Sequence, residues 1–214
     1  MEKLILAVTS FVREYMSQFD SSHDYQHILR VLSLANQIAS RERSLHPHIC
    51  YDTDVVTLAS LLHDVGDKKY LKKDEVSGQM VEKFHTLHGA DAELARRVQL
   101  IVAHVSYSTE IKDPAKVQKV LSEQPELAVV QDADRLDAIG AIGIGRCFTF
   151  AGAKRQEDGM IGAITHLGEK LERLEGMMKI GTGKELAAVR TRRLKTFRSW
   201  WGEEAMVIEH MGSE

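Results

Sequence analysis

Cysteine is scarce in this chain of 214 residues, which has only Cys50 and Cys147. Two cysteines are too few for a disulfide framework or for the thiolate clusters that select structural zinc. Free thiols are stable in a reducing compartment, so we expect a cytoplasmic protein in which both cysteines have structural roles.

Proline is nearly as rare, and the sequence has no Pro/Gly/Ser-rich linker that would divide it. Its three prolines are Pro47, Pro114 and Pro125. Apolar residues recur at helical spacing along most of the chain, and no convincing series of period-two strands is present. The sequence therefore predicts an all-α fold in one domain spanning residues 1–214.

Long apolar runs and a strong excess of one charge are also lacking. No run approaches the length that spans a membrane, and residues 1–19 mix charged with apolar side chains, which predicts an amphipathic first helix and not a signal peptide. The net charge of −3 argues against a general nucleic-acid binder. We expect a small anionic ligand, no membrane partner and no nucleic-acid partner, while a homo-oligomer stays open.

Helical periodicity and capping residues predict a succession of helices. The charged residues 67–74 between two of them suit either a lid or a solvated turn, and the glycines of residues 140–152 suggest close helix packing. The basic segment 184–201 suits the solvated face of a packed terminal helix better than a nucleic-acid surface. The predicted helices cover residues 2–19, 24–41, 53–64, 74–85, 90–104, 114–123, 125–139, 141–151, 159–179 and 184–206.

Ionisable residues stand out within three of these helices. The pair His63-Asp64 closes the apolar run 55–62, and His27 begins an apolar stripe, so its imidazole faces the buried side of its helix. Residues 129–140 carry three acids in a mostly apolar setting. An unpaired buried carboxylate is costly, so these groups need partners or a metal ion. Together the three segments predict a metal site.

The order and spacing of these segments resemble the HD superfamily of metal-dependent phosphohydrolases. The resemblance covers roughly residues 22–150, which would form the motif-bearing core, followed by C-terminal helices at about 159–206. It is strongest to small stand-alone bacterial HD hydrolases, some of which act on nucleoside triphosphates. The residues that carry it are His27-x-x-Arg30-Val31, His63-Asp64 and Ala133-Asp134-Arg135.

The resemblance implies that a divalent ion is held by His27, His63, Asp64 and Asp134. Imidazoles and carboxylates suit Mn²⁺, which we expect, as well as Mg²⁺, Fe²⁺, Co²⁺ or Zn²⁺. Asp132 competes with Asp134, but two helical positions differ by about 200° in direction, so both cannot face one ion. Asp134 has the family's Ala-Asp-Arg context. Asp137 lies on nearly the same face and would either orient a ligand histidine or pair with Arg135 or another cation.

Other residues are candidates for water activation and substrate contacts. Asp67 lies where some HD enzymes place a catalytic glutamate, although a surface position explains it equally well. His88 and His104 lie between His63-Asp64 and Asp134 in the sequence. They would hold a second metal or, as we prefer, contact phosphate. His23 is expected to be structural, at a helix start capped by Ser22 or Asp24, although its ring could still reach the mouth of the site. The candidate substrate-binding residues are Lys68, His88, His104, Arg135 and Arg146.

The predicted activity is hydrolysis of a nucleotide by metal-activated water, with a nucleoside triphosphate giving a monophosphate and pyrophosphate. This preference follows from the resemblance alone. A nucleotide phosphomonoesterase or a cyclic-nucleotide phosphodiesterase would use the same metal logic. A non-catalytic nucleotide-sensing module is the alternative from another class, and a nucleic-acid binder using residues 184–201 is a third.

Overall fold

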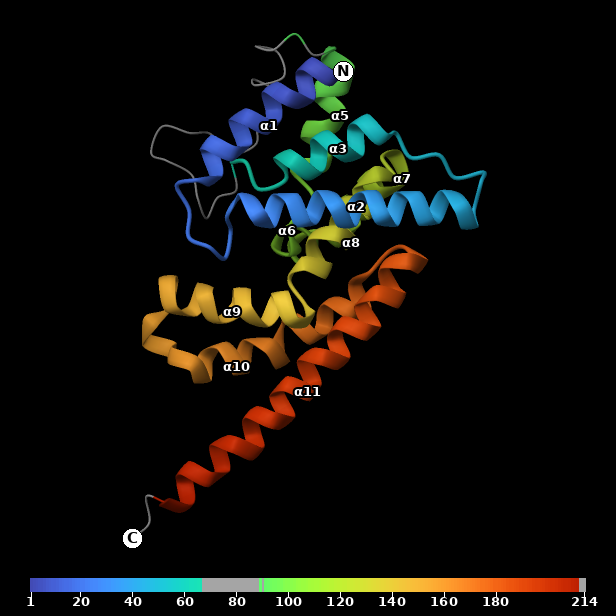
Figure 1. The fold of residues 1–214 in the computed structure, drawn as a ribbon. Coiled ribbons are helices and arrows are strands. Elements are labelled where there is room, and N and C mark those ends of the chain that lie inside the picture. Colours follow the sequence, from blue (N-terminus) through green and yellow to red (C-terminus); the bar gives the residue numbers. More distant parts are fainter. Residues whose placement is uncertain (67–88, 90, 212–214) are drawn as a thin grey trace.

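The computed structural model describes residues 1–66, 89 and 91–211, with side chains as far as residue 205. Within these residues the chain forms only α-helices, two short 3-10 helices and the turns between them, which confirms the all-α prediction (Figure 1). The elements are α1 (Glu2–Met16), α2 (Tyr25–Leu45), α3 (Thr53–Leu62), α5 (Ala92–Val102), α6 (Tyr107–Lys112), α7 (Pro114–Glu123), α8 (Glu126–Asp137), α9 (Gly140–Lys154), η1 (Gln156–Asp158), α10 (Gly159–Glu169), η2 (Leu171–Met177) and α11 (Gly181–Met211).

Apart from the unpredicted η1 and shifts of a few residues at helix ends, the predicted helices differ from the observed ones in two places. The single helix predicted over 159–179 is wrong, because α10 ends at Glu169 and Lys170 leaves helical geometry at φ −121° and ψ −54° before η2 begins. The short helix α6 was not predicted, since six residues give no measurable periodicity; Ser106 caps it by accepting from the Thr109 amide. The helix predicted over 74–85 lies outside the described residues.

Aspartates start several helices by capping their free backbone amides. Asp52 accepts hydrogen bonds from the Asp54 and Val55 amides at the start of α3, and Asp24 accepts one from the His27 amide at the start of α2. The cap on α2 fixes which residue opens the helix. His27 consequently lies in the first turn with its side chain buried.

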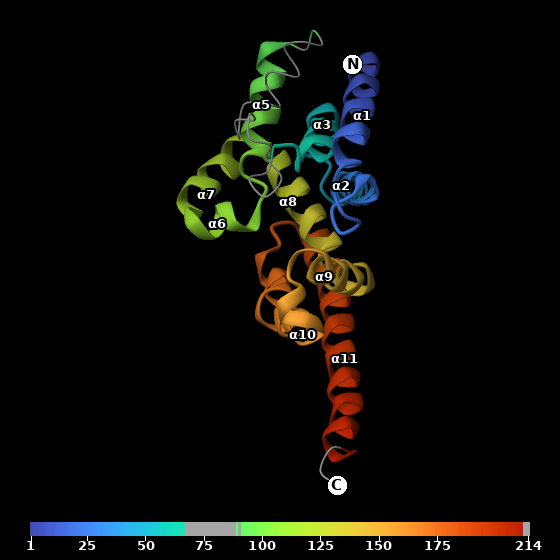
Figure 2. The same ribbon diagram turned by 90° about the vertical axis from the view of Figure 1, so that its left-hand side faces the viewer.

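Buried side chains form two apolar clusters, and α2, α3 and α8 contribute to both of them. One cluster joins these helices to α1, α5 and α7; the other joins them to α10, η2 and α11. Figure 2 shows α8 running between α2 and α3 on one side and α6 and α7 on the other. The elements that carry the predicted metal ligands are therefore the ones most firmly held by the core.

The glycines of residues 140–152 explain only part of the close packing expected there. A Cβ on Gly143 would overlap the Ala138 carbonyl oxygen, and Gly140 has a φ of +75° with the Arg190 side chain beside it. These two glycines allow α9 to start tightly against the end of α8 and against α11. Gly145 and Gly152 have open space around them, so the packing explanation is wrong for these two.

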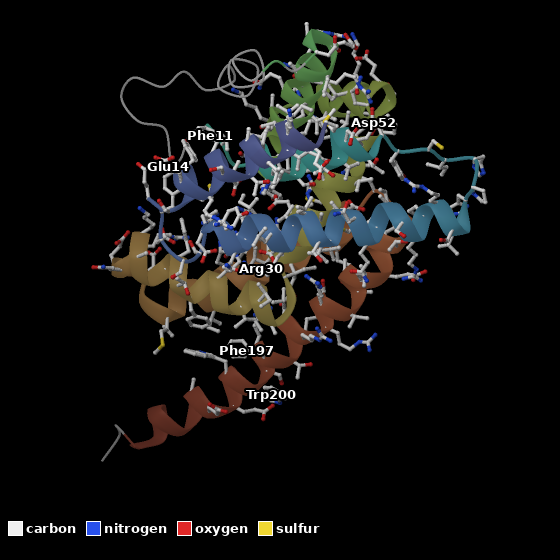
Figure 3. All side chains as sticks on the ribbon, turned by 45° about the horizontal axis from the view of Figure 1, so that its top comes forward. Phe11, Glu14, Arg30, Asp52, Phe197 and Trp200 are labelled. Atoms are coloured by element: carbon white, nitrogen blue, oxygen red, sulfur yellow. The ribbon has the colours of Figure 1, made fainter. Side chains whose placement is uncertain are left out.

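Helix α11 packs its first half against the body and extends away from it (Figure 1). Phe197 contacts Phe148 of α9, with ring centroids 6.0 Å apart, whereas Trp200 is 58% exposed (Figure 3). Arg192, Arg193 and Lys195 are exposed, as a solvated face requires. Among the described helices, none is by itself long and apolar enough to cross a membrane; α8 and α9 pass that test of length and composition only when joined across a 70° bend.

Candidate metal centre

Three helices bring four potential ligands to one point. His27 comes from the first turn of α2, His63 and Asp64 follow the last residue of α3, and Asp134 lies on α8. His27 Nε2 is 3.1 Å from His63 Nε2 and 3.2 Å from Asp64 Oδ2. Asp134 Oδ1 lies 3.7 Å from the first nitrogen and 3.8 Å from the second. This spacing suits four donors around one ion.

Hydrogen bonds on the far side of both imidazoles favour the form that ligates a metal. His63 Nδ1 lies 2.8 Å from the Ser60 carbonyl oxygen, and His27 Nδ1 lies 2.7 Å from Asp137 Oδ2, so each Nδ1 donates. In a neutral ring the Nε2 atom then carries a lone pair. The two facing Nε2 atoms, 3.1 Å apart, would have no proton between them.

The Asp64 carboxylate also needs a positively charged partner, which a metal ion would provide. Asp64 Oδ2 is buried and accepts no hydrogen bond from any residue that the structure describes. Burial alone would raise the pKa of Asp64, but without a metal ion the positive charge of protonated His63 and His27 outweighs burial and lowers that pKa well below its ordinary value. A metal ion would supply that positive charge in place of the two protons. A buried carboxylate oxygen without a donor and two converging nitrogen lone pairs therefore fit a divalent ion.

Asp137 contacts His27 on the side of the ring that faces away from the other potential ligands. Its carboxylate accepts from His27, from Arg30 Nε at 2.7 Å and from Arg146 Nη1 at 3.0 Å. Burial would raise the pKa of Asp137, but the hydrogen bonds from His27 and Arg30 lower it far below its ordinary value. Of the two roles considered for Asp137, orienting a ligand histidine matches the contacts, and its cation partners are Arg30 and Arg146, not Arg135.

Asp132 faces away from the cluster, as the helical rotation argument requires. It is fully buried and accepts from the Lys179 amide at 2.9 Å and from the Ile180 amide at 2.9 Å, just before α11 begins. Burial, although opposed by these two hydrogen bonds, raises its pKa to about 6. Asp132 thus anchors the start of α11, and Asp134 is the acid directed at the two histidines.

Because Asp132 anchors α11 and Asp134 faces the histidines, alanine at the first position should lower stability and alanine at the second should weaken metal binding. Asp132→Ala leaves two amides without their acceptor and is expected to lower the free energy of unfolding by about 2 kcal/mol while metal binding persists. Asp134→Ala is expected to cost under about 1 kcal/mol, because this side chain is partly exposed, but to weaken metal binding at least about tenfold. Urea unfolding of the metal-free proteins and metal titration measure the two effects, and a loss of metal in the Asp132 variant alone would reverse the assignment.

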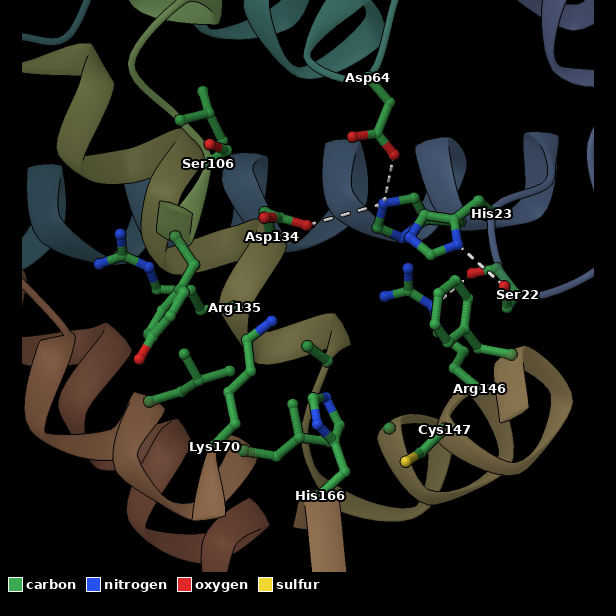
Figure 4. A pocket seen from close by; sticks show the side chains of 18 of the residues that line it. Ser22, His23, Asp64, Ser106, Asp134, Arg135, Arg146, Cys147, His166 and Lys170 are labelled. Atoms are coloured by element: carbon green, nitrogen blue, oxygen red, sulfur yellow. Dashed lines mark hydrogen bonds and ion pairs between the residues drawn. The ribbon is translucent and has the colours of Figure 1, made fainter. Parts of the chain in front are cut away.

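A pocket of about 360 Å³ opens beside the cluster. Figure 4 shows Asp64 and Asp134 toward one end of it and His166, Cys147 and Lys170 toward the other. The lining combines polar groups with apolar ones, as small-molecule sites do. The lining residues are Ser22, His23, His27, His63, Asp64, Val105, Ser106, Tyr107, Asp134, Arg135, Ala138, Gly143, Arg146, Cys147, Phe150, Arg155, His166, Lys170, Leu171 and Leu174.

Only some of the described candidate substrate-binding residues line the pocket. Arg146 lines the pocket and donates to the Ser22 carbonyl oxygen as well as to Asp137. Arg135 also lines the pocket but is only 2% exposed, and its guanidinium is held by Glu110 Oε2 at 2.5 Å and the Met177 carbonyl oxygen at 2.9 Å. His104 is a core residue outside the pocket lining, donating from Nδ1 to the Leu100 carbonyl oxygen at 2.7 Å. Asp67, Lys68 and His88 lie outside the described residues.

His23, expected to be structural, follows the alternative stated for it, because it lines the pocket. Its Nδ1 lies 2.9 Å from Ser22 Oγ. Ser22 is hydrogen-bonded to Asp20, so Asp24 is the residue that caps α2. Sequence reasoning missed two other residues of the pocket wall. His166 and Lys170 also line the pocket. Their only sequence signal is a spacing of four, which places two residues on one helical face. That signal does not connect them to the distant motif.

An all-helical fold with two buried histidines and a half-buried aspartate beside an open pocket is typical of metal-dependent hydrolases built on helical bundles. The model of the HD domain family matches residues 24–139, more than half of the chain, and the chain belongs to this family. The resemblance seen in the sequence is thereby confirmed. The protein is a metal-dependent phosphohydrolase of the HD type.

Known relatives match nearly the whole chain. YpgQ of Bacillus subtilis is 37% identical over 195 residues, which cover 86% of this chain and 84% of YpgQ. The structure of YpgQ in complex with ADP has a TM-score of 0.71 at 32% identity, covering 94% and 95% of the two chains. A structure from Lactobacillus plantarum has a TM-score of 0.79 at 27% identity, and the match covers 97% of this chain and 99% of the other. The structure of an HD-superfamily hydrolase from Bacillus thuringiensis has a TM-score of 0.67 at 28% identity, and the match covers 94% of this chain and 95% of the other.

Proposed function

We propose that the protein hydrolyses a nucleotide, with a nucleoside triphosphate and water giving a nucleoside monophosphate and pyrophosphate. The observation that carries this proposal is the opening of the metal cluster directly into a pocket whose other end has cationic side chains. The ADP bound by YpgQ supports a nucleotide as the ligand. Manganese is the proposed metal, because its coordination suits mixed imidazole and carboxylate ligands.

Different residues of the chain would bind the metal, position the attacking water and supply positive charge. His27, His63, Asp64 and Asp134 would hold the ion, and Asp137 keeps His27 turned toward it. A bound divalent ion lowers the pKa of water and polarises a phosphoryl oxygen. Asp67 remains our candidate for positioning the attacking water, which adds its oxygen to the α-phosphorus as the bond to the bridging oxygen breaks. Arg146, fixed by Asp137 and Ser22, supplies positive charge beside the pocket.

A substrate panel tests the proposal directly. The metal-stripped protein, with manganese restored, is incubated with nucleoside mono-, di- and triphosphates and with cyclic nucleotides, and the products are separated by chromatography. We expect monophosphate and pyrophosphate in equal amounts from a triphosphate, and at least about a hundredfold less product without metal. Asp113→Asn serves as a control, since Asp113 is an exposed cap that does not line the pocket and asparagine caps helices equally well.

Other products would identify the alternatives. Nucleoside and phosphate from a monophosphate would make the protein a nucleotidase, and a linear product from a cyclic nucleotide would make it a phosphodiesterase. Nucleotide binding without turnover under any metal would favour a sensing module.

A further inference from the structure

The pocket has two walls of different origin. The metal end is built by α2, α3 and α8, all within the residues that match the HD domain family. The opposite wall comes from α9, α10 and η2, which follow residue 139 and so lie beyond that match. Features of this second wall therefore belong to this chain and its full-length relatives, and they decide what the pocket accepts beyond the reacting group.

Charge is distributed unevenly between the walls. Asp64 and Asp134, at the metal end, are the only acids among the described lining residues. The second wall carries Arg146, which is bonded to Asp137, and also Arg155, His166 and Lys170. Burial lowers the pKa of His166, and the positive charges of Lys170 and Arg155 lower it further, so the three groups lie within one another's field. Such a wall attracts an anion at a distance from the metal.

Lys170 is the member of this group best placed to contact a ligand. It caps the C-terminus of α10, and its ammonium lies 4.9 Å from the centroid of the Tyr107 ring. Figure 4 shows its side chain extending into the pocket toward Asp134, with His166 behind it. Arg155 lines the same wall and forms an ion pair with Asp158. The contact between the ammonium and the Tyr107 ring restrains the Lys170 side chain and so reduces the entropy lost when it binds an anion.

We propose that Lys170 binds a second phosphate group of the substrate while the scissile phosphate lies at the metal centre, which makes the pocket selective for nucleoside di- and triphosphates over monophosphates. His166 lies one helical turn before Lys170 and lines the same wall, where its ring nitrogens can hydrogen-bond the phosphate oxygens. The inference rests on the proposed function, since it takes a nucleotide as the ligand. A monophosphate would occupy the metal end alone and leave the cationic wall without an anion.

Binding of an uncleavable analogue tests this assignment apart from turnover. The manganese-loaded protein is titrated calorimetrically with α,β-methylene-ADP and with AMP at fixed ionic strength. Lys170→Met removes the charge and keeps an unbranched stem against Tyr107, while Lys170→Arg restores a positive charge. Lys195→Met is the matched control, because Lys195 is exposed on α11 and does not line the pocket.

We expect Lys170→Met to weaken binding of the methylene analogue about tenfold, the typical loss for one charge-assisted contact, and to change AMP binding by less than about twofold. Lys170→Arg should recover most of the loss, and Lys195→Met should change neither ligand by more than about twofold. Equal losses for both ligands, or no preference of the wild-type protein for the analogue, would overturn the inference even if the panel showed turnover. Discrimination by Lys170 without any turnover would support the inference and overturn only the proposed hydrolysis.

Discussion

Asp64→Asn is expected to remove the bound metal and to lower turnover at least about a thousandfold while the helical fold persists. The substitution keeps the shape of the side chain, removes its negative charge and replaces one carboxylate oxygen by an amide NH2 group, which cannot ligate a cation. The buried Oδ2 atom, which accepts no hydrogen bond from the described residues, is the group whose chemistry changes most. Elemental analysis of the purified protein and product release from the triphosphate measure the two effects.

Thermal unfolding separates the loss of metal from a loss of structure. Saturating manganese at about 100 times its Kd should stabilise the wild-type protein by about 2.7 kcal/mol and leave the Asp64 variant unchanged. The metal-free proteins should unfold within about 1 kcal/mol of one another. Asp113→Asn should respond to manganese as the wild type does. A variant that keeps both its metal and its activity would show that Asp64 is not a ligand.

Much of the metal centre could be predicted because its signals are local. The stripe that follows His27 and the cap at Asp52 determine which helical faces turn inward, and those are properties of a few adjacent residues. The rotation between Asp132 and Asp134 is likewise fixed by helix geometry alone. Local periodicity and helix rotation therefore predict which side chains face inward, whereas the grouping of His27, His63, Asp64 and Asp134 into one ligand set came from the resemblance to the HD superfamily.

The partners of the buried charges could not be predicted, because they depend on contacts between distant segments. Arg30 and Asp137 lie 107 positions apart, and Arg135 is paired with Glu110 of a helix too short to show a pattern. Lys170 interrupts a segment that reads as one continuous helix, and the pocket that it lines is shared with residues far away in the sequence, such as His27 and Asp64. A sequence pattern gives the face of a helix but not the element that covers it.

Asp137 offers the strongest test of whether a residue behind the ligands controls the metal. Asp137→Ala would leave His27, Arg30 and Arg146 without their shared acceptor. Breaking a buried ionic network at one partner costs about 3–5 kcal/mol, and the partial exposure of Arg30 puts the expected loss at the lower end, about 3 kcal/mol. Losing the acceptor that orients a ligand histidine should also weaken metal binding about 10- to 100-fold.

Two further variants separate these effects. Asp137→Asn keeps one acceptor oxygen, so it should retain more stability than the alanine variant yet still bind metal less tightly, because a neutral amide holds the His27 proton less strongly. Glu185→Ala breaks the exposed pair with Arg41 and should cost less than about 1 kcal/mol with metal affinity unchanged. Urea unfolding of the metal-free proteins gives the stabilities, and metal titration gives the affinities. If Asp137→Asn bound manganese as tightly as the wild type, the carboxylate would serve the fold alone, and the orientation of His27 would have to come from its packing in α2.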